Sequence, residues 1–230
     1  MPAHLISRGT LTPAQCGFIQ RLLDAGPDVA RVHLGVPFKS PSAFGVTFRK
    51  PGRKPQDPEL APLYRDAPKP GPWFIIAIRG DVTNDAQLLL TLAHELEHVR
   101  QELTCPGLLE FGNCARDYVA DNASAFPTLP CELFVPVNLH AEARAARDVA
   151  AIIGQPAVDA HYADRPTLRG ALDRTDSESA AQDLAAFLSA HCDHFKQWYL
   201  SVIRPTKPPL NSVQDFVLQH RQAAGRRMRG

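Results

Sequence analysis

The chain has 230 residues, of which 44% are hydrophobic and 21% are charged, and its formal net charge at pH 7 is +1. This length and composition predict a folded globular protein, with one well-buried domain or a core plus a smaller lobe, and argue against a disordered chain. The balanced charge gives no general argument for a nucleic acid or a membrane surface as partner. No apolar run approaches the roughly 20 residues that span a bilayer.

The first part of the chain predicts one helix followed by three strands. Thr12-Pro13 is a typical helix start, and Gly26-Pro27 marks the end of that helix. Three strand-like runs follow, at residues 29–34, 43–48 and 73–78. The last run, Trp-Phe-Ile-Ile-Ala-Ile, predicts a buried strand. If its edge is free, an extended peptide could pair with it by β-augmentation.

The segment after this strand contains His-Glu-x-x-His. Asn84 and Gln87 resemble a capping box that begins a helix, and on that helix His94 and His98 project from one face. Two imidazoles at this spacing can bind one Zn²⁺, while Glu95 reaches the metal-bound water. Leu89, Leu92 and Leu96 form an apolar stripe on the opposite side. The pattern predicts a zinc site with Glu95 as general base.

A catalytic zinc usually takes a third protein ligand. Residues 138–153 predict a helix that ends at Gly154, and Glu142 is the sole acid within its alanine-rich apolar stripe. A carboxylate on such a face needs a metal or a cation as partner. Glu142 is therefore the predicted ligand, with Glu132 and then His140 as alternatives, and a salt bridge from Glu142 to Arg100 as the non-metal interpretation.

The order of these elements resembles the gluzincin zinc metallopeptidases, and among them the compact ImmA/IrrE-like bacterial proteases. The resemblance covers residues 70–154 and rests on the strand, on Ala-His-Glu-Leu-Glu-His, and on the later helix with its glutamate. It implies His94, His98 and Glu142 as zinc ligands and Glu95 as the general base. It also implies an α+β fold with a zincin-like core, made of a small sheet, a metal-binding helix and a third-ligand helix.

The last third of the chain predicts a helical lobe. Helices are expected at residues 179–203 and 213–224, and the segment 104–130 is expected to be a loop. We therefore expect a catalytic core over residues 1–163 and a helical C-terminal lobe over residues 164–230 that packs on it. The closing basic tail, Arg226–Arg229, is the one segment that could contact nucleic acid, and a solvated terminus is the simpler interpretation.

The five cysteines bear on the compartment. They form no Cys-x-x-Cys pair, which argues against a zinc ribbon or a redox motif. The first residues lack the layout of a signal peptide, so free thiols and a cytoplasmic protein are expected. One disulfide among Cys105, Cys114 and Cys131 is the alternative, and it would indicate a secreted effector.

The expected activity is hydrolysis of peptide bonds in a specific protein or peptide. Zinc would activate a water, Glu95 would take its proton, and His161 or Tyr162 would stabilise the oxyanion, with Tyr118 as another option. Two alternatives stay open: a non-catalytic regulatory or binding protein on the same scaffold, and a zinc amidohydrolase acting on a small substrate.

Overall fold

The computed structural model describes residues 4–29, 31–39, 43–50, 55, 57–66, 73–82, 84–126, 135–175, 180–202 and 207–227. The chain forms two compact units, each built from two segments. The first unit comprises Met1–Arg100 and Arg144–Pro166, and the second comprises Gln101–Ala143 and Thr167–Gly230. This division differs from the single boundary predicted after residue 163, because two long helices, α3 (Asp85–Thr104) and α6 (Pro136–Ile153), each contribute residues to both units.

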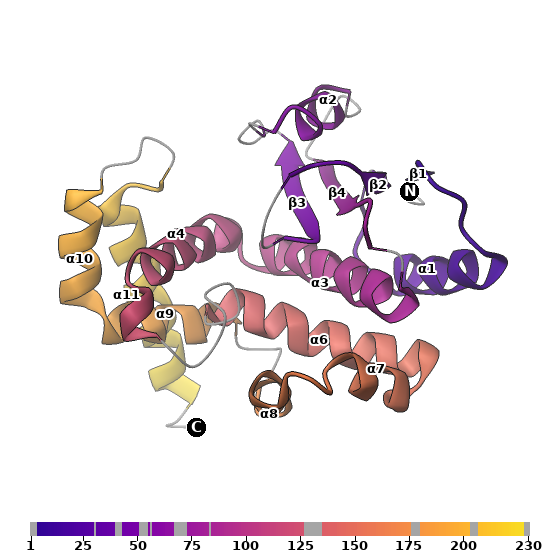
Figure 1. Ribbon diagram of the computed structural model, residues 1–230. Helices are drawn as coiled ribbons and strands as arrows, with labels where there is room; N and C mark the ends of the chain where they lie inside the picture. Colours follow the sequence, from indigo (N-terminus) through magenta and orange to yellow (C-terminus); the bar gives the residue numbers. More distant parts are fainter. Residues whose placement is uncertain are drawn as a thin grey trace. The chain divides into compact units, whose positions relative to one another are not determined.

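A four-stranded mixed sheet lies in the first unit, and together with the many helices it makes the fold α+β, as predicted. The strands are β1 (His4–Ser7), β2 (Arg31–Val36), β3 (Gly45–Lys50) and β4 (Trp73–Arg79), in the spatial order β1-β2-β4-β3 (Figure 1). β1, β2 and β4 are parallel, whereas β3 runs antiparallel to β4. The two strands before β4 begin and end about where the apolar runs predict them.

The hypothesis that an extended peptide pairs with the third predicted strand requires a free edge, and β4 has none. β4 pairs with β2 on one side and with β3 on the other, and its residues Phe74–Ile78 are buried. A strand covered on both faces reads as a continuous apolar run, so its sequence shows burial but not its neighbours. On this side, β3 is the edge strand of the sheet.

The helices of the first unit begin and end at local signals. α1 (Pro13–Ala25) begins after Thr12 and ends at Gly26, as predicted, and its start carries a capping box between Thr12 and Gln15. α3 (Asp85–Thr104) follows Asn84, whose Oδ1 accepts a 3.2 Å hydrogen bond from the main-chain N–H of Gln87. α2 (Leu60–Arg65) packs against the sheet through Leu60 and Leu63, and α7 (Gln155–His161) follows the turn at Gly154.

The two faces of the sheet carry different partners. Phe48, Ile75 and Ala77 belong to the apolar cluster of α2. Gly45 and Thr47 lie on the other face, because successive strand residues alternate, and there they contact α3. The sheet therefore presents β3 directly to the helix that carries the histidine motif.

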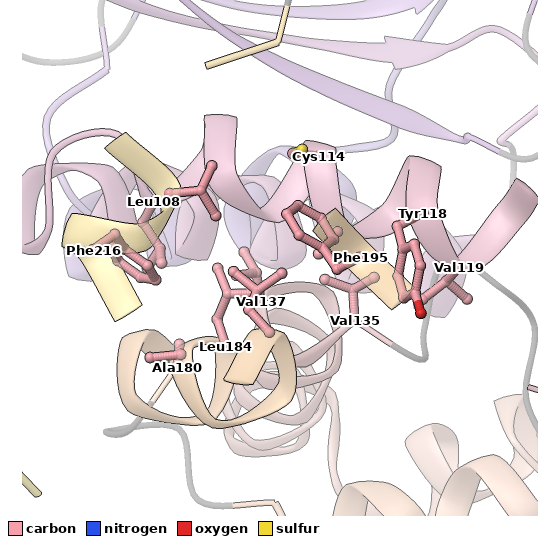
Figure 2. Packing of buried hydrophobic residues seen from close by; sticks show 14 of the residues in the cluster. Leu108, Cys114, Tyr118, Val119, Val135, Val137, Ala180, Leu184, Phe195 and Phe216 are labelled. Carbon is pink, nitrogen blue, oxygen red and sulfur yellow. The ribbon is translucent and has the colours of Figure 1, made fainter. Parts of the chain in front are cut away.

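The second unit is helical. Its elements are α4 (Leu108–Asp121), the 3₁₀ turn η1 (Ala123–Ala125), the first part of α6 (Pro136–Ile153), α8 (Pro166–Asp173, from Thr167), α9 (Ala180–Ala190), α10 (Cys192–Ser201) and α11 (Leu210–Arg227). Figure 2 shows buried side chains of α4, α6, α9, α10 and α11 meeting in one core, which includes Leu108, Val119, Val137, Leu184 and Phe195. These helices therefore share a core of their own.

Three predictions about this unit are corrected. Within the predicted loop of residues 104–130, Leu108–Asp121 form the helix α4, which places Leu108, Ala115 and Val119 in the core. The helix predicted over residues 179–203 is broken at His191, where α9 gives way to α10. The last helix begins at Leu210, before the predicted Val213, and the end of the basic tail, Met228 and Arg229, lies outside the described residues.

The described cysteines are free thiols: Cys16, Cys105, Cys114 and Cys192. Cys131 lies outside the described residues. Over the described part of the chain, every helix is too short or too polar to cross a bilayer.

Candidate metal site on helix α3

The two histidines of the motif meet on one face of α3. Their ring centroids are 4.6 Å apart and their planes are nearly perpendicular, at 88°. Both side chains are half-buried, in a helix whose opposite side holds the buried Leu89, Leu92 and Leu96. Neighbouring imidazoles one helical turn apart fit as two ligands of one zinc ion. Among the described residues, no group of three or more His, Cys, Asp or Glu side chains is placed to hold a metal.

Glu95 is held against the sheet. Its side chain is 5% exposed. Oε2 lies 2.7 Å from Oγ1 of Thr47 on β3, and the same hydroxyl lies 3.1 Å from the main-chain oxygen of Glu95. The residue predicted as general base is therefore buried, with one carboxylate oxygen accepting a hydrogen bond from a neighbouring strand.

Gly45 allows β3 to approach α3 this closely. A Cβ atom at this position would lie 2.8 Å from Cγ and Oε1 of Glu95 and 2.8 Å from Cγ2 of Thr91. Such contacts are shorter than van der Waals packing permits, so a side chain here would displace the helix or the glutamate. The sequence shows only a Gly-x-Thr inside a predicted strand, which is why neither Gly45 nor Thr47 is identifiable from the sequence.

Glu97, between the two histidines, has a structural partner. It is 4% exposed and forms an ion pair with Arg100 one turn later. Burial raises the pKa of Glu97, and Arg100 opposes this effect. On α6, Arg144 donates from Nε to Asp148 at 2.9 Å, and both groups act electrostatically on Glu97. These four side chains connect α3 to the later part of α6 within the first unit.

The candidates for the third ligand lie elsewhere in the chain. Glu142 is half-buried on the part of α6 that belongs to the second unit, between the buried Ala141 and Ala143. His140, an alternative ligand, is 1% exposed, and its Nε2 lies 2.8 Å from Oδ2 of Asp183 on α9. Glu132 lies outside the described residues.

The predicted oxyanion donors lie at the end of α7 and in the helical core. His161 is the last residue of α7, and its ring centroid lies 4.9 Å from that of Tyr162. Tyr162 is 1% exposed and is among the largest fully buried side chains, whereas His161 is half-buried. Tyr118, on α4, packs against Phe195 and Trp198 in the core of the second unit, and burial raises its pKa. His161 is therefore the more accessible of the three.

The chain matches no protein-family model, no curated protein and no solved structure. The functional assignment consequently rests on the residues of the site.

Proposed function

We propose that the protein is a zinc-dependent metallopeptidase of the gluzincin type that hydrolyses a specific protein or peptide. The observation that supports this most is the pair of histidine rings on α3, 4.6 Å apart, together with Glu95 of the same helix, which is buried and hydrogen-bonded to Thr47 of β3. Zincin-like architecture is part of the proposal: a small sheet beside the metal-binding helix, followed by a helix with the third ligand.

The proposed roles follow from the donor types. His94 and His98 would hold the ion, and Glu142 is the third ligand that the sequence favours. When bound, zinc supplies a water acidic enough to act as nucleophile at neutral pH and polarises the scissile carbonyl. Glu95 takes a proton from the attacking water and later passes it to the leaving amine. His161 is the candidate donor to the oxyanion.

The edge strand β3 favours an extended peptide over a small amide as substrate. The N–H of Arg79 donates to the carbonyl of Phe44 at 2.8 Å, so this opposed pair is a hydrogen-bonded one. Hydrogen-bonded and non-bonded pairs alternate in an antiparallel ladder. The main-chain groups of Gly45, Thr47 and Arg49 therefore point away from β4, and no described strand pairs with β3 on that side. A peptide added there would run past Glu95.

Metal analysis beside a cleavage assay tests the proposal. Wild-type protein should carry one zinc per chain, and His94→Ala and His98→Ala should lose it. Glu95→Gln should keep the metal but cleave a peptide library, read by mass spectrometry, about 100-fold more slowly or worse. Glu110→Gln, on the exposed side of α4, is the matched control and should behave as wild type. Full activity of the Glu95→Gln protein would exclude the catalytic proposal and favour the alternative of a non-catalytic binding protein.

Two further comparisons separate the remaining alternatives. Zinc should be weakened in Glu142→Ala and retained in Glu132→Ala, and the reverse result would assign the ligand to Glu132. Cleavage should rise with peptide length and fall when the peptide backbone is N-methylated, because methylation removes the donors that pair with β3. Equal cleavage of a dipeptide amide would instead indicate an amidohydrolase of small substrates.

A further inference from the structure

We infer that Thr47 is a positioning residue that orients the Glu95 carboxylate and connects it to the peptide-binding edge of β3. This inference rests on the proposed function, because it assigns Thr47 a task in that reaction. Its basis is the contact between one hydroxyl on the edge strand and one carboxylate on the motif helix.

The hydroxyl selects one of the two carboxylate oxygens. Thr47 Oγ1 carries a single proton and lies closer to Oε2 of Glu95, at 2.7 Å, than to the Glu95 main-chain oxygen, at 3.1 Å. Of these two acceptors, a charged carboxylate oxygen forms a stronger hydrogen bond than a main-chain carbonyl oxygen. Thr47 therefore fixes the position of Oε2 and, with it, the orientation of the carboxylate.

Gly45 allows the second carboxylate oxygen of Glu95, Oε1, to lie beside the edge of the sheet. Oε1 lies 2.8 Å from the position that a Cβ of Gly45 would occupy, so it is next to the backbone of β3. The main-chain groups of Gly45 and Thr47 are the ones that point away from β4. The Glu95 carboxylate thus lies next to the backbone that would pair with a substrate.

Thr47 suits this task because its side chain is stiff. Two heavy atoms on Cβ restrict χ1, so the direction of the hydroxyl follows the backbone of β3. Glutamate has three rotatable side-chain bonds, and without the hydroxyl its buried carboxylate would lose a donor and a fixed orientation. A peptide that pairs with β3 would hold the Thr47 backbone, and through it the carboxylate.

The kinetic test compares Thr47→Val, which keeps the shape but removes the hydroxyl, with Thr47→Ser, which restores it. Thr47→Val should lower kcat by roughly 10- to 100-fold, a part of what a general base contributes. KM and zinc content should stay within about twofold, because the backbone of β3 and both histidines are untouched. Thr47→Ser should recover most of the lost kcat. An unchanged kcat in Thr47→Val, or no recovery in Thr47→Ser, would overturn the inference.

A second readout does not depend on activity. In metal-free protein labelled with ¹³C at the glutamate carboxyl, the resonance of Glu95 is identified by its absence in Glu95→Gln. This resonance should shift in Thr47→Val and stay near its wild-type position in Thr47→Ser. If it is the same in all three proteins, Thr47 does not orient Glu95. If it shifts but no variant, Glu95→Gln included, changes cleavage, the proposed function fails while the contact stands.

Discussion

The main-chain N–H of Gly107 donates a 2.9 Å hydrogen bond to Oε1 of Glu102, and the N–H of Leu109 lies 3.3 Å from Oε2 of the same residue. Glu102, on the last turn of α3, thereby caps the start of α4. Gly107 makes this turn with a φ of +90°, which side-chain-bearing residues rarely adopt. The carboxylate also lies at the positive end of the α4 dipole.

Removing this cap should destabilise the protein. Glu102→Ala leaves two N–H groups of α4 without their acceptor, which costs about 1–2 kcal/mol of unfolding free energy. Chemical denaturation with urea would measure it. Glu110→Ala, an exposed residue in the first turn of the same helix, should change stability by no more than about 0.5 kcal/mol. Equal effects of the two substitutions would show that Glu102 is not the cap.

Alanine should have opposite effects at two glycines of the first unit. Gly45→Ala would force its Cβ to within 2.8 Å of Glu95 and Thr91, so we expect a loss of about 1–3 kcal/mol. Gly17 lies exposed inside α1 with no atom within 4 Å of a Cβ, so Gly17→Ala should stabilise the helix by about 0.5–1 kcal/mol. Thermal unfolding followed by circular dichroism tests both signs, and a Gly45→Ala protein as stable as wild type would contradict the close approach of β3 to α3.

His33 on β2 should make the protein less stable in mild acid. The side chain is 7% exposed, and its Nε2 has no hydrogen-bond partner among the described residues. Burial lowers its pKa below the ordinary value of 6.5, and the nearby Arg31 and Arg8 add to the effect. As the pH falls, His33 therefore takes up a proton more readily in the unfolded chain than in the folded protein. The free energy of unfolding should decrease as the pH falls below 6.5.

His33→Leu removes this titration and the unpartnered ring nitrogen together. Urea midpoints measured between neutral and mildly acidic pH should fall less steeply in the variant than in wild type. Parallel pH curves for the two proteins would show that His33 is not the group responsible.

The cysteines should differ sharply in reactivity. Cys114 is 2% exposed, and burial raises its pKa to about 12, whereas Cys16 and Cys192 are exposed. Because the thiolate is the reactive form, an alkylating reagent at neutral pH should label Cys16 and Cys192 in the native protein and Cys114 only after denaturation. Peptide mapping by mass spectrometry would show this, and early labelling of Cys114 would mean that the core around α4 opens readily.

The elements that the sequence predicts well are those with strong local signals. The helix start at Thr12-Pro13, the apolar run of β4, and the helix that starts after Asn84 and carries the histidine motif depend on residues a few positions apart. The turn at Gly154, with a φ of +89°, is equally local. Capping, periodicity and glycine conformation act over one or two turns of chain, so they are readable without the fold.

The errors concern segments whose state depends on distant partners. The sequence does not predict α4, because the apolar face of this helix is short and is buried only by packing with α9 and α10 in the same core. The break at His191 divides a helix that periodicity alone treats as continuous. The neighbours of β4 could not be predicted either, since a buried apolar run does not reveal which strands lie beside it.

The sequence by itself determined the chemistry of the candidate site: two histidines one turn apart, with a glutamate after the first, on a helix with a defined start. Only the tertiary structure decided what holds that glutamate. Thr47 and Gly45 come from a strand some fifty residues earlier, and they reach Glu95 because β3 joins the edge of the sheet and faces α3. Helical spacing is a property of neighbouring residues, whereas contact between strand and helix depends on how the whole sheet is ordered.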